Sequence, residues 1–288
     1  MPEGDTIFRS ARALQGALAN EKVIRFETAY ALLARVDDQT PVAGRTIERV
    51  ESRGKWLLVY FSGDLILLTH MLMNGSWHIY RPGQRWQRPR SQMRIVITTE
   101  HFEAVAFEVP VAQFHTARSL ERHPSLPKLG PDLLKPAFAE SEAELRLRSH
   151  ADEEVANVLL NQQVMAGIGN VFKSEICFAC GIHPFRLVAT LTANEIACLL
   201  DTARKQLSAN VLESSTDGVV MYSGVRRTRR TSDPGARLWV YRRSGHPCWR
   251  CGTTILMRKQ GVGARSTYWC PECQPWSAGS TVTGWASV

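Results

Sequence analysis

The first part of the chain changes from helical spacing to short runs with turn residues between them. Between Thr6 and Leu18 the apolar residues recur every three or four positions, which predicts a helix with Asp5 as its N-cap. Strands are expected in the branched and aromatic runs that follow: Thr46–Glu51, Lys55–Phe61, Leu65–Thr69, Met93–Thr98 and Phe102–Glu108. Many short strands separated by tight turns predict an antiparallel β-sandwich.

The second part has the apolar spacing of helices. A segment with three prolines and one glycine within 124–132 predicts a linker that ends near residue 136. Asn170 suits the N-cap of one later helix, and Thr192 with Glu195 forms the capping-box pattern of another. Three helices are expected: at 152–163, from 170 to near Gly181, and at 192–211.

The charge balance narrows the class of partner. Lys and Arg number 35 and Asp and Glu number 27, which gives a net charge of +8 and favours a polyanion such as nucleic acid. No run reaches the roughly 18 apolar residues of a membrane span. The start Met-Pro-Glu-Gly-Asp carries acids where a signal peptide needs basic and apolar residues. A cytoplasmic protein without membrane contact is therefore expected.

Cysteine usage points to a metal. Seven cysteines in a reducing compartment argue against a disulfide framework. Four of them form two C-x-x-C pairs eighteen residues apart, the spacing of a zinc ribbon: Cys248, Cys251, Cys270 and Cys273. Four protein ligands fill a tetrahedral site, so one structural Zn²⁺ per chain is expected. Cys177, Cys180 and Cys198 fall in predicted helices, where buried structural cysteines are the usual case.

Three segments together resemble one enzyme family. They are the start Met1–Asp5, the stretch Met165–Glu175 and the ribbon segment Ala264–Cys270, which in this order resemble the Fpg/Nei DNA glycosylases. The resemblance extends from Pro2 to Gln274, and the Pro-Glu-Gly start resembles the Nei (endonuclease VIII) branch.

The resemblance implies an α+β fold in two domains. An N-terminal helix with an antiparallel β-sandwich is followed by a helix-two-turns-helix domain with a C-terminal zinc ribbon. The expected boundaries are 1–123 for the catalytic sandwich domain, 124–136 for the linker, 137–238 for the helical DNA-binding domain, 239–275 for the ribbon and 276–288 for a disordered tail.

The resemblance also implies a DNA glycosylase with AP lyase activity that acts in base excision repair. Removal of Met1 would expose Pro2 as a secondary amine able to attack the sugar C1′ and form a Schiff base. A helix N-terminus behind Pro2 disfavours the protonated amine. Glu3 is then the general acid, and Lys55 assists β-elimination. Arg265 matches the arginine that grips phosphates and is linked with δ-elimination.

The same family pattern assigns DNA contacts. Asn170 matches a DNA-contacting asparagine, Lys128 is a phosphate candidate, and Leu72 with Met73 matches the loop that fills the space left by a flipped base. The segment 107–114 lacks the arginine by which the Fpg branch reads the opposite base, which favours the Nei branch and oxidised pyrimidines as substrates.

Several alternatives stay open. A zinc-ribbon protein that binds damaged DNA without catalysis would keep the same fold, and salt-sensitive binding without covalent chemistry would distinguish it. A metal-dependent nuclease is disfavoured because no cluster of carboxylates or histidines suits a catalytic ion. The arginine-rich loop at 226–230, expected to be mobile, either covers the flipped base or attracts phosphates. The partner expected is damaged DNA in the bacterial nucleoid, bound by a monomer that needs no cofactor for turnover.

Overall fold

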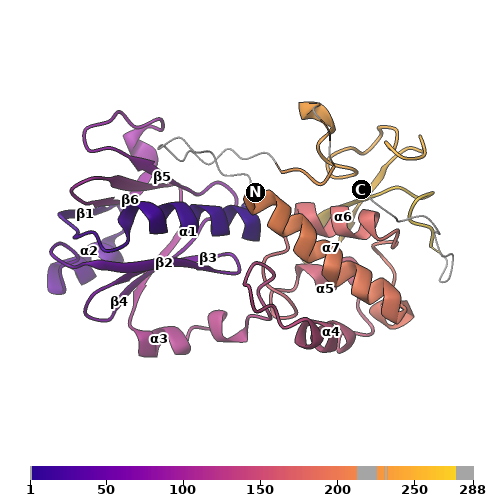
Figure 1. Ribbon diagram of the computed structural model, residues 1–288, viewed down its shortest axis with the longest axis horizontal. Coiled ribbons are helices and arrows are strands. Elements are labelled where there is room, and N and C mark those ends of the chain that lie inside the picture. The colour runs from indigo at the N-terminus through magenta and orange to yellow at the C-terminus, as the bar shows by residue number, and fades with distance from the viewer. Residues whose placement is uncertain (1, 213–225, 230, 232, 277–288) are drawn as a thin grey trace. The chain divides into compact units, whose positions relative to one another are not determined.

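The computed structural model describes residues 2–212, 226–229, 231 and 233–276. It divides the described chain into two compact units, the first ending at Lys128 and the second beginning at Leu129 (Figure 1). The expected tail after residue 276 and residue 230 of the arginine-rich loop lie outside the described residues. The finer domain boundaries at 123, 136 and 238 stay predictions.

The first unit begins with helix α1, Gly4–Leu18, which Figure 1 shows in indigo along the strands. Its apolar residues at helical spacing are buried, as the sequence predicts. The prediction of Asp5 as N-cap is wrong. The N-cap is Glu3, and Asp5 lies in the first turn with its carboxylate fully buried, where it accepts a hydrogen bond from Thr6 and pairs with Arg9.

Two four-stranded antiparallel sheets form the rest of the first unit. One has the order β1-β6-β7-β5, with bounds Arg25–Thr28, Met93–Thr98, Glu103–Phe107 and Ser76–Tyr80. The other has the order β2-β3-β4-β8, with bounds Ile47–Arg53, Trp56–Phe61, Leu65–His70 and Val111–His115. One apolar core contains side chains from α1 and from strands of both sheets. Shorter helices complete the unit: α2 Ala31–Gln39, η1 Arg90–Gln92, α3 Ala117–Glu121 and η2 Leu126–Lys128.

The second unit is a group of helices with a β-hairpin. Its helices are α4 Glu140–Arg148, α5 Val155–Leu160, α6 Asn170–Ala179, η3 Val188–Thr190, α7 Ala193–Leu212 and η4 Pro234–Ala236. The hairpin strands are β9 Leu256–Gln260 and β10 Arg265–Trp269. A separate apolar core joins α4, α5, α6 and α7. The two units therefore have cores of their own.

The helix ends of the second unit test the capping predictions. Thr192 and Glu195 form the expected capping box, since each backbone N–H donates to the other side chain, at 2.7 Å from Thr192 and 3.2 Å from Glu195. Gly181, at φ +67°, ends α6, and the N–H of Ile182 reaches the carbonyl of Cys177 at 2.9 Å. The prediction of Asn170 as N-cap is wrong, because Gly169 holds that position and no side chain caps the helix.

The cysteines of α6 and α7 correct another expectation. Cys177 is buried and free, as predicted. Cys180 and Cys198 form a disulfide, with their Cα atoms 6.0 Å apart, and both are only half-buried. The two helices pack against each other and bring the thiols together, which sequence spacing alone does not reveal. The expectation that these two cysteines serve only as buried apolar residues is therefore wrong.

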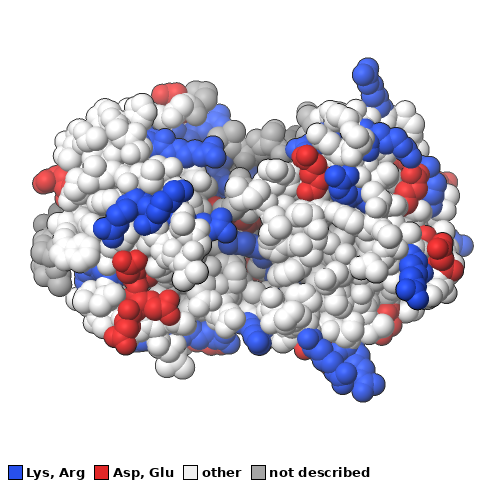
Figure 2. Space-filling model, turned by 180° about the vertical axis from the view of Figure 1, so that it is seen from behind, with Lys and Arg blue, Asp and Glu red and all other residues white. Residues whose placement is uncertain are grey.

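Surface charge does not by itself locate a binding face. Figure 2 shows the Lys and Arg side chains of one face in several separate groups, with Asp and Glu between them. Among the described residues, no helix combines the length and the apolar character needed to cross a bilayer.

Candidate functional site

The chain start lies at the positive end of α1. Glu3 is the N-cap and its carbonyl accepts a hydrogen bond from the N–H of Ile7 at 3.1 Å. Its side chain has no solvent exposure, whereas Pro2 is half-buried. The helix dipole and the unpaired N–H groups of the first turn favour negative charge here and disfavour a protonated amine. A carboxylate and a residue able to supply a secondary amine are thus adjacent.

Lys55 lies in the two-residue turn of a hairpin rather than at the start of a strand. Arg53 pairs with Trp56, which leaves Gly54 and Lys55 as the turn between β2 and β3. Gly54 has φ +57°, which the first position of a hairpin turn requires and which glycine adopts without strain. The Lys55 ammonium is near His70: burial is the main cause that lowers the pKa of His70 to about 4, and the charge of Lys55 lowers it further.

The turn at 71–74 carries an exposed apolar tip. Met71 is buried in the core at 1% exposure, whereas Leu72 and Met73 are 46% and 57% exposed. Leu72 has φ +45°, and its N–H donates to Nδ1 of His70 at 3.1 Å. Gly75 closes the turn, because a Cβ there would lie 2.6 Å from the carbonyl oxygen of Met71. Of the methionine-rich run, only Met71 is core, and the two residues assigned to the DNA stack point outward.

The two turns between α5 and α6 are held by one side chain. The Gln162 amide donates to the carbonyls of Leu160 at 2.8 Å and Ile168 at 3.0 Å, and its carbonyl accepts from the N–H of Gly167 at 3.1 Å. Gly167 has φ +117°, a conformation that other residues rarely adopt. These bonds fix the loop in front of α6, where backbone N–H groups face outward from a helix start.

Asn170 is the first residue of α6 and is 8% exposed. Its side chain does not cap the helix, and its Oδ1 finds no hydrogen-bond donor among the described residues. A buried amide oxygen without a donor costs free energy. The position is therefore suited to an external donor or to a water-bridged ligand.

Glu175 is a fully buried carboxylate that fastens a distant segment onto α6. It accepts hydrogen bonds from the backbone N–H groups of Trp239, Val240 and Tyr241 at 2.8, 2.9 and 2.9 Å, and from the hydroxyl of Thr228. The described residues from 226 to 243 therefore do not form the free loop expected from their sequence. Further bonds between Arg227 and Asn210 hold the start of the segment to α7.

The four ribbon cysteines converge. Their sulfur atoms all lie within 4.8 Å of one another. The separations are 3.9 Å for Cys248–Cys273, 3.4 Å for Cys251–Cys270 and 3.6 Å for Cys251–Cys273. A tetrahedron with Zn–S bonds of about 2.3 Å has sulfur atoms about 3.8 Å apart. The donor set and its dimensions therefore fit one Zn²⁺ ion.

The hairpin that carries Arg265 is anchored to the helices. Arg265 is exposed at the start of β10, beside a turn that includes the fully exposed Val262. At the opposite position of β9, the buried Gln260 donates to Glu154 at 2.8 Å and to the carbonyl of Pro184 at 3.0 Å. The amide of Gln260 thus ties the base of the exposed turn to the N-terminus of α5.

The predicted site residues fall into two groups. Within the first unit, Lys55 and Leu72 share a neighbour in His70, and Lys128 is exposed on η2. The second unit contains Asn170, Arg265 and the four cysteines. The sequence reasoning missed His70, Gln162 and Gln260. No periodicity or motif singles out these three, because each acts through backbone groups that only the folded turns bring near.

Comparison with known families matches each part of the chain. The N-terminal domain of formamidopyrimidine-DNA glycosylases matches residues 1–118, their H2TH domain matches 129–220, and a zinc finger found in FPG and IleRS matches 245–275. The chain belongs to the Fpg/Nei family of DNA glycosylases and AP lyases.

Similar proteins place this Fpg/Nei enzyme on the Nei branch. A probable endonuclease 8 2 of Streptomyces coelicolor is 40% identical over 95% of this chain and 94% of that protein. The DNA-(apurinic or apyrimidinic site) lyase Nei2 of Mycolicibacterium smegmatis is 35% identical over 95% and 99%. Endonuclease 8 of Escherichia coli K12 is 31% identical over 95% and 100%.

Solved structures agree on the fold. Lactococcus lactis Fpg in complex with DNA containing an abasic site matches with a TM-score of 0.78 and 22% identity, over 95% of this chain and 100% of that one. MutM in complex with DNA containing carbocyclic 8-oxo-G matches with a TM-score of 0.77 and 22% identity, over 95% and 100%. The Nei-branch chain therefore has the Fpg fold, with the four-cysteine zinc-finger cluster at its end.

Proposed function

We propose that this DNA glycosylase/AP lyase removes oxidised bases from damaged DNA, pyrimidines in preference, and uses Pro2 as its nucleophile. The observation that carries the proposal is the fully buried Glu3 carboxylate, adjacent to Pro2 at the N-terminus of α1. A nucleophile beside a positioned acid is the arrangement that covalent catalysis with proton transfer requires. Removal of Met1 is needed to make the Pro2 nitrogen a secondary amine.

The chemistry proceeds in balanced steps from these groups. The Pro2 nitrogen lone pair attacks C1′ of the damaged nucleotide, and the bond from C1′ to the base breaks with its electrons leaving on the base. The C1′–O4′ bond then opens as Glu3 gives a proton to O4′, which yields the iminium. Loss of a C2′ proton expels the 3′ phosphate, and a second elimination expels the 5′ phosphate. Water releases Pro2 and leaves a one-nucleotide gap with a phosphate at each end.

The remaining site residues act on the DNA. We assign Leu72 and Met73 to the space left by the flipped base, since both are large, apolar and exposed on a fixed turn. Lys55 assists the β-elimination, and Lys128 contacts phosphate. Asn170 binds the DNA through its uncapped amide, and the Arg265 guanidinium forks onto phosphates and supports δ-elimination.

The short connection between β7 and β8 supports the preference for pyrimidines. β7 ends at Phe107 and β8 begins at Val111, so three residues join them. Val109 is fully buried, and Glu108 pairs with Arg88 at 2.9 Å. This connection has no arginine to read the base opposite an oxidised purine, which is how the Fpg branch is expected to use its longer loop. The relatives named endonuclease 8 point the same way.

The zinc is proposed to be structural. Cys248, Cys251, Cys270 and Cys273 would bind Zn²⁺ with all four positions filled by protein, so the ion would shape the ribbon and take no part in turnover. The chemistry of Pro2 and Glu3 needs no other cofactor.

Borohydride trapping tests the mechanism. Wild-type protein, shown by mass spectrometry to lack Met1, is incubated with a duplex carrying one oxidised pyrimidine and then reduced. We expect a covalent adduct on Pro2 and none with Pro2→Gly, and base release with Glu3→Gln should fall by at least about a hundredfold, the usual contribution of a general acid. Duplexes with an oxidised purine or an abasic site measure the preference.

Two outcomes would contradict the proposal. Salt-sensitive binding without any adduct on the three substrates would favour a damaged-DNA-binding protein without catalysis. Strand cleavage that is abolished by EDTA while the ribbon keeps its zinc would favour a metal-dependent nuclease.

A further inference from the structure

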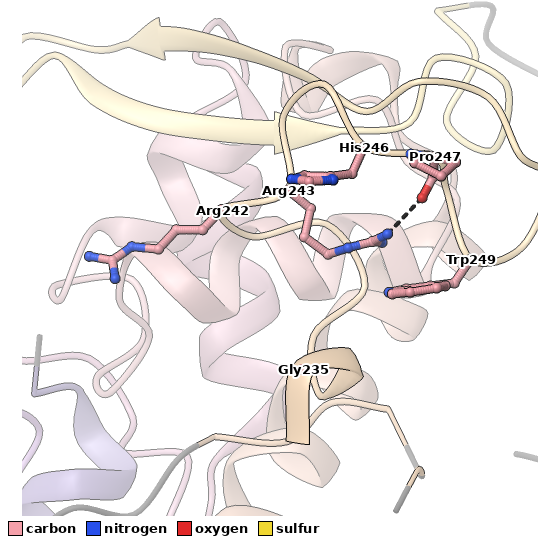
Figure 3. A pocket seen from close by; sticks show the side chains of 6 residues that line it. All are labelled: Gly235, Arg242, Arg243, His246, Pro247 and Trp249. Atoms are coloured by element: carbon pink, nitrogen blue, oxygen red, sulfur yellow. Dashed lines mark hydrogen bonds between the residues drawn. The ribbon is translucent and has the colours of Figure 1, made fainter. Parts of the chain in front are cut away.

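A pocket in the second unit lies outside the residues assigned to the reaction. It has a volume of about 410 Å³ and is lined by Gly235, Arg242, Arg243, His246, Pro247 and Trp249. Figure 3 shows Trp249 and Arg242 on opposite sides of Arg243, with Gly235 below them. A cavity of this size falls in the range of small-molecule sites and can hold one nucleotide.

The wall of the pocket is fixed by hydrogen bonds. The Arg243 guanidinium donates to the carbonyls of Trp239 and Pro247, both at 2.6 Å, and lies 4.0 Å from the centre of the Trp249 ring. Trp239 is itself fastened to Glu175 through its N–H. Trp249 lies between Cys248 and Cys251, so a metal in the cluster would hold it as well. The pocket is thus preorganised on both sides.

Two features of the pocket remain available to a ligand. Trp249 keeps 44% of its surface exposed although it is a large aromatic side chain. Arg242 is exposed, makes no ion pair with any described residue, and has φ +60°, where glycine is the usual residue. A strained, charged residue at the edge of a pocket suggests that its side chain is used there.

The surroundings select an anionic, aromatic ligand. From Arg226 to Lys259 the sequence has nine arginines and one lysine but only one acid, Asp233. Arg229 lies 4.9 Å from the Trp249 ring, and the nearby Glu175 is already occupied by four hydrogen bonds. Exposed tryptophan with arginine is the combination that binds unpaired bases and their phosphates.

We propose that this pocket binds one unpaired nucleotide of a DNA strand, with the base against Trp249 and its phosphate on Arg242. The site is separate from the base-excision chemistry, because none of its residues takes part in the proposed reaction. It would let the enzyme hold a single-stranded segment.

Binding of an undamaged strand tests the proposal. Fluorescence anisotropy with a labelled ten-residue oligothymidylate compares the wild type with Trp249→Ala, Trp249→Phe and Arg242→Gly. Loss of the indole should weaken binding about tenfold or more, and phenylalanine should restore most of it. Glycine suits the backbone of residue 242, so Arg242→Gly removes only the guanidinium and should reduce the salt slope by about 0.7. Arg35→Ala, an exposed arginine of α2, is the matched control and should change nothing.

Photocrosslinking gives an independent readout. A strand with one 5-iodouracil should crosslink to the peptide that contains Trp249. Equal binding by wild type and Trp249→Ala, or crosslinks only elsewhere, would overturn the proposal. Competition by inorganic phosphate as effective as that by the strand would show a plain anion site, and competition by free thymidine monophosphate as effective as that by the strand would show a mononucleotide site, each of which overturns it.

Two controls separate this result from others. Zinc content and melting temperature must match among the variants, which excludes a folding defect. The strand carries no lesion, so a failure of borohydride trapping leaves this test unaffected, and the reverse also holds.

Discussion

His70 connects two of the predicted site elements of the first unit. Its Nδ1 accepts the N–H of Leu72, so the ring must present an unprotonated nitrogen to the exposed turn. Burial lowers the pKa of His70 to about 4, and the neighbouring charge of Lys55 acts in the same direction. At neutral pH the ring is therefore neutral and able to hold the turn that carries Leu72 and Met73.

The depressed pKa of His70 predicts how stability depends on pH. Above pH 6.5 the ring is neutral in both the folded and the unfolded states, and its contribution to the unfolding free energy is complete. Between pH 6.5 and about 4 the unfolded chain takes up a proton that the folded protein does not, so stability falls as the pH falls. The slope from one such histidine is at most about 1.4 kcal/mol per pH unit.

Urea unfolding between pH 7.5 and 4.5 measures this slope, and His70→Asn should reduce it by up to the contribution of one histidine. Asparagine keeps an acceptor near the N–H of Leu72 but does not titrate, so its difference from wild type should be constant above pH 7. His78 and His183, whose pKa values burial also lowers to about 4, should maintain part of the slope. Identical slopes in wild type and variant would show that His70 is protonated in the folded state.

At the scale of elements, Glu175 determines how the segment after α7 folds. Each of its two carboxylate oxygens accepts two hydrogen bonds from the segment 228–241. An amide in place of the carboxylate presents an NH₂ group to donors. We expect Glu175→Gln to reduce the free energy of unfolding by about 2–4 kcal/mol, because buried donors lose their acceptor.

Hydrogen exchange locates the effect of that change. The amides of Trp239, Val240 and Tyr241 should exchange faster in Glu175→Gln, and urea unfolding should give the total loss. The matched control is Glu142→Gln, which removes an exposed ion pair with Arg146 on α4 and should cost no more than about 0.5 kcal/mol. If both variants lost the same small amount, the carboxylate would not organise the segment.

Element formation was predictable where apolar runs are continuous. β3 and β4 are almost wholly buried and contain runs of branched side chains, so their positions follow from the sequence. β5 is equally buried but carries His78, whose ring nitrogens bond Ser76 and Tyr80 at 3.0 Å each. A polar residue satisfied by its neighbours hides such a strand from any apolar pattern. β1, with four residues and charges at two of them, gives no signal either.

The candidate site was predictable only as separate motifs. Pro2 with Glu3 and the four cysteines are short sequence signals, and the structure places the cysteine sulfurs together. The support behind them is not local in sequence: Gln260 reaches Glu154 across 106 positions, and Glu175 reaches Tyr241 across 66. Such contacts depend on tertiary packing, which no periodicity reports.

At the scale of the molecule, the distribution of cysteines separates the two units. All seven cysteines follow Leu129, and the core of the first unit contains none. The ribbon, in contrast, packs only a small cluster around Val240, Ile255 and the buried cysteines. So small a core cannot fold a ribbon alone, and metal binding must supply the difference.

Removal of zinc should therefore unfold one part of the molecule and leave the other intact. Zinc-finger peptides gain on the order of 10–16 kcal/mol from the metal, far more than this cluster can provide. After treatment with a strong chelator, amide exchange should rise over 245–275 while the strands of the first unit stay protected. Arg265 would lose its fixed position, and the salt slope of DNA binding should fall by about 0.9 for each phosphate that the ribbon no longer neutralises. Added Zn²⁺ should restore both properties. A ribbon that stays protected without metal would show that its own packing holds it, because the first unit contributes no cysteine ligand.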